Sequence, residues 1–239
     1  MRAALRWLLL VLLAALALQL FFLLRVASMA VLDPQSTTFQ RTEMWRITQE
    51  KGRLRWRQQW VDYAQLPENL KRAVIASEDG AFRQHEGVDW EALEKAWQRN
   101  AMAEEQVARR NLRARPHRII GGSTITQQLA KNLLLSGERT LLRKGQELVL
   151  AFCLERLLSK ERILEIYLNN VEWGEGVFGA EAAAQHYFRK AAAQLTAYEA
   201  ARLAVMLPRP RYFEKLPNSG YLASRAATIV ARMRDAELP

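Results

Sequence analysis

The chain begins with a long run of apolar residues. From Trp7 to Leu24 the sequence reads WLLLVLLAALALQLFFLL, in which Gln19 is the only strongly polar residue. Eighteen residues in a helix span about 27 Å, which is close to the thickness of the hydrocarbon core of a bilayer. Arg2 and Arg6 precede the run. The positive-inside rule therefore predicts a cytoplasmic N-terminus and an exported remainder.

A cleaved signal peptide is the alternative interpretation of this run. Residues 28–30 (Ser-Met-Ala) have the small-x-small form of a cleavage site. The apolar run, however, is longer than the roughly 7–15 residues typical of a signal-peptide core. We therefore expect residues 1–30 to form a cytoplasmic tip and an uncleaved membrane anchor. In both cases the rest of the chain is exported.

Helical patterns dominate most of the exported part. We interpret residues 31–66 as a partly extended linker and residues 67–239 as one mostly α-helical domain, because alternating strand patterns are almost absent. Five stretches carry the helix signals: a start at Pro67-Glu68, a charged helix followed by a basic loop between Val88 and Arg118, a start at Ser123-Thr124, a long helix from about Thr140 to Leu158, and a capping box at Thr196 whose helix ends before Pro208.

Composition narrows the functional classes. The 239 residues are 50% hydrophobic, which excludes a disordered chain, and the single cysteine, Cys153, excludes an intramolecular disulfide. The net charge of +10 indicates an anionic partner, either phosphate-bearing lipid or nucleic acid. Without residues 1–30 the body keeps 32 basic and 25 acidic residues, a net charge of +7. Export argues against nucleic acid and favours anionic membrane headgroups.

The glycine pair before the Ser123-Thr124 helix start is a candidate anion site. Such a start exposes backbone N–H groups and the positive end of the helix dipole, which suit a phosphate. Lys131 lies two turns further on and Arg139 lies just beyond the predicted helix, so both side chains could reach the same anion. The alternative is an ordinary glycine turn with a Ser/Thr cap.

Two acidic positions also carry candidate chemistry. Glu147 follows Arg143 and Lys144 by one helical turn. One interpretation is a solvated ion pair that stabilises the helix by at most about 0.5 kcal/mol. The other is a carboxylate held in a positively charged site, where it could bind a metal ion. Glu78 and Asp79 end a predicted helix, where negative charge is unfavourable. This placement suggests a role other than stability for the two acids.

Five segments, in this order and spacing, resemble the peptidoglycan glycosyltransferase family, which is the transglycosylase domain of penicillin-binding proteins. They are EDGAFRQHEG (78–87), GGSTITQQ (121–128), RKGQE (143–147), KERILEIYLN (160–169) and WGEGVFGAEAAAQHYF (173–188). The resemblance covers about residues 60–215. Since no penicillin-binding transpeptidase domain follows, it implies the monofunctional form from a Gram-negative bacterium.

The resemblance implies a lysozyme-like glycosyltransferase fold with a small membrane-associated jaw, and polymerisation of lipid II into β-1,4-linked glycan with release of undecaprenyl pyrophosphate. It also implies a role for each matching residue. These are Glu78 as catalytic base, Glu147 as second functional acid, Ser123, Gln127, Gln128, Lys131 and Arg139 in donor or pyrophosphate binding, Arg143 and Lys144 as added positive charge, and Asp79, Phe82 and His85 as support within the first segment.

The resemblance further implies a divalent cation, Mg²⁺ or Mn²⁺, near Glu147, and no organic cofactor. Lipid II, the growing glycan strand and the membrane are the expected partners, with other cell-wall synthases and division proteins as candidates and no nucleic acid. The expected location is a bacterial inner membrane, with a single span, a cytoplasmic N-terminus and a periplasmic catalytic domain.

Two other functions compete with polymerisation: a lysozyme-like lytic enzyme and a non-catalytic anchored partner of a synthase complex. The sequence also departs from the family in one place. The stretch between Trp90 and Gly121 is highly charged, whereas the family's jaw is usually more apolar. The depth at which this jaw enters the bilayer is therefore left open by the sequence.

Overall fold

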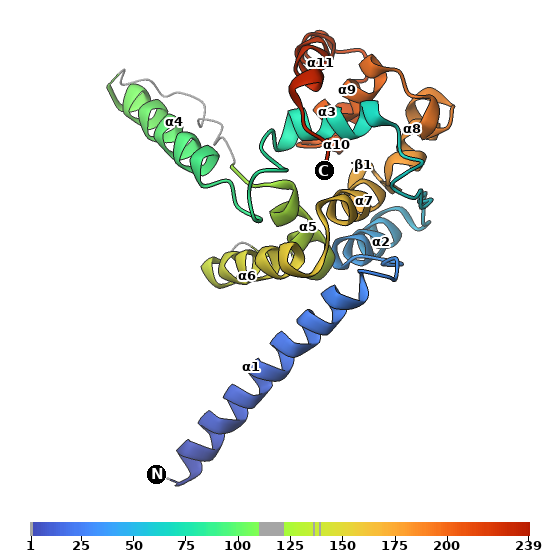
Figure 1. Ribbon diagram of the computed structural model, residues 1–239. Helices are drawn as coiled ribbons and strands as arrows, with labels where there is room; N and C mark the ends of the chain where they lie inside the picture. The colour runs from blue at the N-terminus through green and yellow to red at the C-terminus, as the bar shows by residue number, and fades with distance from the viewer. Residues whose placement is uncertain (1, 110–121, 136, 139) are drawn as a thin grey trace.

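The computed structural model describes residues 2–109, 122–135, 137–138 and 140–239, which fold into a mostly helical body with one long helix extending from it (Figure 1). This confirms the predicted fold class. The helices are α1 (Arg2–Ser28), α2 (Thr38–Lys51), α3 (Glu68–Glu78), α4 (Trp90–Arg109), α5 (Ile125–Leu134), α6 (Leu141–Leu157), α7 (Lys160–Asn170), α8 (Ala180–Phe188), α9 (Ala197–Met206), α10 (Pro210–Glu214) and α11 (Gly220–Arg232). The strands are β1 (Glu172–Gly174) and β2 (Val177–Phe178).

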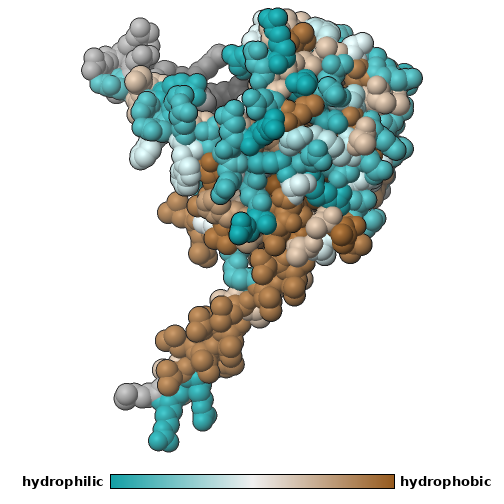
Figure 2. All heavy atoms as spheres, viewed as in Figure 1, coloured by the Kyte–Doolittle hydropathy of each residue, from teal (hydrophilic) through white to brown (hydrophobic). Residues whose placement is uncertain are grey.

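The N-terminal apolar run lies in α1, a single helix of 27 residues. Most of its leucines are exposed, and Figure 2 shows a nearly continuous apolar surface along the helix with a hydrophilic tip. By length and by a mean hydropathy of 2.7, α1 is able to cross a membrane. Val26 near its end and Met29 just after it are buried against the body.

The core of the body surrounds α7, in which every residue from Ile163 to Asn170 is buried. Helix α5 packs against α6 and α7, while α3 and α11 pack against α9. Trp173 and Tyr167 are among the largest fully buried side chains. The indole N–H of Trp173 donates to the Leu203 carbonyl at 3.0 Å, so this polar group enters the core with its hydrogen bond made.

Helix starts follow the predicted caps. Thr124, Thr140 and Thr196 are the N-cap residues of α5, α6 and α9, and each side chain accepts a hydrogen bond from a backbone N–H of the first turn. Pro67 is the N-cap of α3, so that helix also begins where the sequence predicts it. These caps fix the helix ends that carry the candidate site.

The linker segment contains a helix, α2, that the sequence analysis did not predict. Thr37 forms a capping box with Gln40: the Thr37 hydroxyl accepts from the Gln40 N–H at 3.0 Å, and the Gln40 side chain accepts from the Thr37 N–H at 2.8 Å. Gln40, Glu43 and Ile47 are buried, and α2 packs against α5. The expectation of a partly extended linker is therefore corrected for this helix, whose inward face is mainly polar and shows no apolar periodicity.

Residues 54–62 of the linker form no helix or turn, and Arg57 joins them to the β1–β2 hairpin. The Arg57 N–H donates to the Gly176 carbonyl at 2.8 Å, and the Phe178 N–H donates to the Arg57 carbonyl at 2.9 Å. Gly176 has a φ of 73°, and a Cβ atom at this position would lie 2.0 Å from the Arg55 carbonyl oxygen. Glycine is therefore required for the linker to approach the hairpin this closely.

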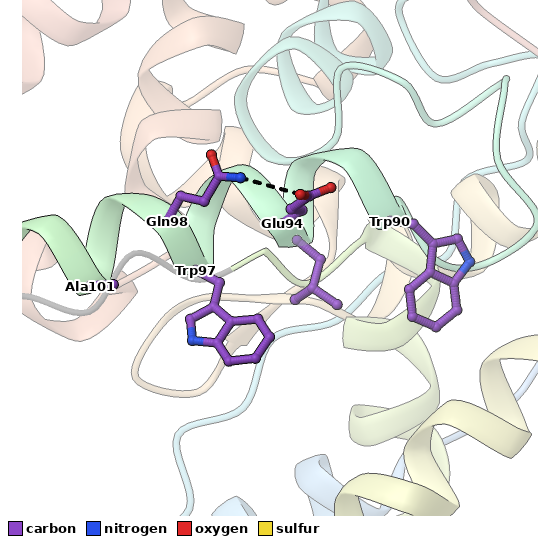
Figure 3. Close-up of a pocket in the computed structure, with 6 residues that line it drawn as sticks. Trp90, Glu94, Trp97, Gln98 and Ala101 are labelled. Carbon is purple, nitrogen blue, oxygen red and sulfur yellow. Dashed lines mark hydrogen bonds between the residues drawn. The ribbon is translucent and has the colours of Figure 1, made fainter.

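The charged stretch after residue 88 forms α4, which projects away from the body (Figure 1). The predicted helix is confirmed, whereas the predicted basic loop and Arg118 lie outside the described residues. Trp90, Leu93 and Trp97 are 61%, 42% and 76% exposed and, with Ala101, line one apolar hollow of about 610 Å³ (Figure 3). These residues form an apolar stripe at helical spacing on a helix whose overall composition is highly charged.

Candidate active site

A groove of about 510 Å³ with a mixed polar and apolar lining crosses the body between α2, α5 and the segment around β1. Gln128 and Lys131 of α5 and Arg143 of α6 line it, and Phe39 and Glu43 of α2 line it as well. A smaller hollow of about 120 Å³ lies beside Glu78, Asp79 and Ser123. The groove brings basic side chains from α5 and α6 together, and the hollow lies beside the acids of the first segment.

Gln128 connects the groove with the hollow. Its side-chain N–H donates to Glu78 Oε2 at 3.0 Å, and its carbonyl oxygen accepts from the Tyr167 hydroxyl at 3.0 Å. Tyr167 is fully buried in α7, so the Gln128 amide is held in one orientation. Burial raises the pKa of Glu78, while the hydrogen bond from Gln128 lowers it. The net rise is typical of a carboxylate that takes up a proton during a reaction.

Asp79 and His85 have a structural role beside Glu78. Asp79 is buried at the end of α3, where its Oδ2 accepts from the Ile125 N–H at 2.9 Å and its Oδ1 lies 2.9 Å from His85 Nε2. The Gly87 N–H donates to His85 Nδ1 at 3.2 Å. Asp79 is thus unfavourably placed for the dipole of α3, at its C-terminal end, but favourably placed for the dipole of α5, at its N-terminal end. Phe82 is fully buried below this loop.

The start of α5 uses its backbone groups within the protein. The Ile125 N–H donates to Asp79, the Gln127 N–H donates to the Thr124 hydroxyl at 3.2 Å, and the Thr124 N–H donates to Gln127 Oε1 at 3.1 Å. These three amides are therefore not free to face a phosphate, contrary to the expectation from the sequence. Gln127 therefore caps the helix, and exposed Ser123 remains beside the hollow.

Glu147 lies between two cations. Its side chain is 3% exposed, its Oε2 accepts from Arg143 at 3.0 Å, and its Oε1 pairs with Lys144. The alternative of a solvated surface pair is therefore wrong. The Nε atom of Arg143 is buried and has no hydrogen-bond partner within the described part of the chain. Lys131 lines the groove, and Arg139 lies outside the described residues.

Comparison with known proteins identifies the family of the chain. The transglycosylase family model matches residues 46–234, most of the chain. The chain belongs to the transglycosylase family. Three proteins named biosynthetic peptidoglycan transglycosylase are close relatives: one from Burkholderia vietnamiensis (51% identity; 95% of this chain and 87% of the relative covered), one from Herminiimonas arsenicoxydans (50%; 100% and 99%) and one from Bordetella pertussis (51%; 96% and 91%).

The site of this transglycosylase does not by itself fit a resident metal ion. The described residues contain no group of three or more His, Cys, Asp or Glu side chains that could hold one. Glu147 is a single carboxylate, and both of its oxygens already contact cations. Mg²⁺ requires several oxygen ligands, which here would have to come from substrate phosphates and water.

Sequence reasoning missed the acidic end of this transglycosylase's groove. Glu43 and Glu172 both line the groove and both pair with Arg211, whose Nε lies 2.8 Å from Glu172. Burial raises the pKa of Glu172 to about 7, against the opposing effect of Arg211. Glu172 lies between two of the family segments, and Glu43 lies in the helix that was not predicted. Nothing in the local pattern therefore pointed to either residue.

Proposed function

We propose that this transglycosylase is a peptidoglycan glycosyltransferase of cell-wall synthesis, which polymerises lipid II into β-1,4-linked glycan and releases undecaprenyl pyrophosphate. The observation that carries the proposal is the half-buried carboxylate of Glu78, which is oriented by Gln128, a residue that also lines the groove with Lys131 and Arg143. The names of the relatives support the same reaction class.

The donor's leaving group explains the distribution of charge. A pyrophosphate leaves without strong general acid catalysis, unlike the alkoxide in ordinary glycoside hydrolysis. It needs stabilisation of its developing negative charge. Lys131 and Arg143 are suited to supply it, since the Nε of Arg143 has no hydrogen-bond partner among the described residues. Arg139 stays a prediction for the same role.

Glu78 acts as the base in this reaction. The acceptor is a sugar 4-hydroxyl with a high pKa, and Glu78 takes its proton as the oxygen attacks the anomeric carbon. Attack opposite the leaving group inverts the α-linked donor to a β-linked product. The raised pKa of Glu78 makes it a stronger base than an exposed glutamate.

Glu147 holds the two cations next to it in place. With Arg143 on one oxygen and Lys144 on the other, it orients positive charge toward the groove and forms no covalent bond to sugar. Ser123 and Gln128 complete the substrate contacts. A Mg²⁺ or Mn²⁺ ion that arrives with the pyrophosphate remains a prediction, and titrating the purified enzyme with EDTA and then with each metal tests it.

The membrane arrangement follows from α1. Arg2 and Arg6 keep the N-terminus in the cytoplasm, and the body with its groove stands in the periplasm beside the lipid-linked substrate. The exposed stripe of Trp90, Leu93 and Trp97 on α4 supports the expected membrane-associated jaw. Protease protection in inverted and right-side-out vesicles tests this topology, since only right-side-out vesicles should expose the body.

The decisive test is the activity of Glu78→Gln on labelled lipid II in detergent. Loss of a general base lowers a rate by about 10²–10⁴-fold, so polymer formation should fall by at least a hundredfold while circular dichroism stays unchanged. The matched control is Glu86→Gln, in the same segment but exposed, which should keep wild-type activity.

The products distinguish the competing functions. Cleavage of existing peptidoglycan by the wild type would indicate the lytic enzyme, and no product from either substrate would indicate the non-catalytic partner. Wild-type polymerisation by Glu78→Gln would remove Glu78 from the role of base.

A further inference from the structure

Helix α1 is attached to the body at its C-terminal end by more than a flexible chain. Val26 and Met29 are buried there, and the Arg162 side chain of α7 donates from Nε to the Met29 carbonyl at 2.8 Å. The same guanidinium pairs with Asp33 at 2.7 Å. Residues on both sides of the junction therefore hold the end of α1 in one orientation.

A second attachment lies within the apolar part of α1. The side-chain amides of Gln19 in α1 and Gln146 in α6 form a reciprocal pair, with each NH₂ donating to the other carbonyl at 2.9 Å and 3.1 Å. Gln19 is nine residues before Ser28, or about 13 Å along the helix axis. Two points this far apart fix the tilt of a helix as well as its position.

The second attachment is next to the candidate active site. Gln146 directly precedes Glu147, and the two side chains point to different sides of α6: Gln146 contacts α1, whereas Glu147 is buried between Arg143 and Lys144. The contact with α1 and the candidate site therefore share α6 but lie on different sides of it.

The surroundings of the pair are apolar. Leu141 and Leu142 of α6 are 92% and 87% exposed, and Val149 and Phe152 are also exposed. Figure 2 shows apolar surface on the lower side of the body continuing onto α1. An amide in such surroundings has few partners other than another amide, and a shift of α1 by one helical turn would move Gln19 by about 5.4 Å and break the pair.

We propose that the Gln19–Gln146 pair fixes the register of the membrane helix against α6 and so sets the height and tilt of the active site above the bilayer. Gln19 and Gln146 are positioning residues: they contact no substrate and act by holding the body in one orientation relative to α1. The proposal rests on the proposed function, because it concerns a substrate that is itself held in the membrane.

The contact is tested by cross-linking in native membranes. Gln19→Cys and Gln146→Cys are combined in a Cys153→Ser background, which removes the free thiol of the wild type. A short bis-thiosulfonate reagent should join the two cysteines within one chain. The matched control pairs Leu12→Cys with Gln146→Cys: Leu12 is on the same face of α1, two turns or about 10 Å away, and should not cross-link.

The positioning role is tested by turnover on two substrates. In the full chain, Gln19→Leu keeps α1 apolar and able to insert, and Gln146→Leu removes the pair from the other side. Both should lower kcat/KM on lipid II in a bilayer by about threefold to tenfold, the range expected for a polar pair between membrane helices. Turnover of a short-chain, water-soluble lipid II analogue should not change, because its position does not depend on the bilayer.

The outcomes separate this proposal from the proposed function. Reversal of the cross-link with a reductant should lower the bilayer activity of the cysteine pair, and renewed linking should restore it. Equal activity of Gln19→Leu and wild type on both substrates, or no cross-link in membranes, would overturn the positioning role. A wild type that is inactive on both substrates would instead overturn the proposed function.

Discussion

Burial of the Glu78 side chain raises its pKa, and the hydrogen bond from Gln128 only partly opposes this effect. The direction of this pKa shift also determines how Glu78 affects the stability of the fold at each pH. A carboxyl group with a raised pKa in the folded state stabilises the fold below its unfolded pKa, and this contribution is lost as the pH rises through the folded pKa. Above its folded-state pKa, the ionised Glu78 therefore makes the fold less stable.

Glu78→Gln should for this reason raise the thermal stability of the protein at pH 8 while it removes activity. The amide keeps the shape of the side chain without a buried charge, and each kcal/mol recovered raises Tm by about 2–4 °C in a chain of this size. The measurement is Tm by calorimetry at pH 8 and pH 5, with the gain smaller at pH 5. A lower Tm at pH 8 would show that the Gln128 hydrogen bond outweighs burial.

Glu172 gives a second pH dependence that can be measured. Its pKa rises from 4.5 to about 7, so its stabilising contribution is present below pH 4.5 and is lost as the pH rises toward 7 and above. Between pH 5 and pH 8 the Tm of Glu172→Gln should therefore rise relative to that of the wild type. The relative gain is on the order of 2 kcal/mol, equivalent to several degrees.

Glu175 provides the matched control for Glu172. A hydrogen bond from Lys51 is the main cause of the lowered pKa of Glu175, and this group stays ionised throughout the range from pH 5 to pH 8. The difference in Tm between Glu175→Gln and wild type should thus be constant in that range. A constant difference for Glu172→Gln as well would contradict the raised pKa of Glu172.

The residue-level chemistry was only partly predictable from the sequence. Short-range spacing was enough to associate Glu147 with Arg143 and Lys144, but it did not reveal that Glu147 is buried. The role of Asp79 could not be predicted, because its main partner is the Ile125 N–H, 46 residues away. Local periodicity carries no information about contacts between distant segments.

Among the elements, α4 leads to a prediction about activity in a lipid bilayer. Trp90 and Trp97 extend from the same side of the helix (Figure 3) and are largely exposed, so neither contributes much to the core. Replacing both with serine should lower kcat/KM on lipid II in bilayers by about tenfold, because full burial of a large apolar side chain is worth about 1.5–3 kcal/mol and partial insertion gives less. Tm should not change.

Trp45→Ser is the control for this experiment. Trp45 is a 69% exposed tryptophan on α2, outside the stripe of α4. Its replacement should leave both activity in bilayers and Tm unchanged. An equal loss of activity in Trp45→Ser would show that tryptophan content, rather than the stripe, is responsible.

The predicted helices combine an apolar face with a recognisable start, whereas α2 lacks the apolar face. The starts at Thr124, Thr140 and Thr196 were found because a capping side chain precedes an apolar repeat. Helix α2 was not predicted because its packed face consists of Gln40 and Glu43 beside Ile47 and therefore shows no apolar periodicity. Its capping box at Thr37 and Gln40 was the available signal.

For the whole molecule, the proposed membrane arrangement makes the charge of the body matter. The chain carries 35 basic against 25 acidic residues, and in that arrangement α1 holds the body beside the bilayer, where each nearby Lys or Arg would contribute about 1 kcal/mol of attraction to anionic lipid. Raising the salt concentration from about 0.05 to 0.5 M shortens the screening length severalfold. The KM for lipid II in anionic nanodiscs should then rise about tenfold with kcat unchanged, whereas KM in zwitterionic nanodiscs should stay constant. The same salt response in both lipids would assign the basic residues to the substrate's pyrophosphate alone.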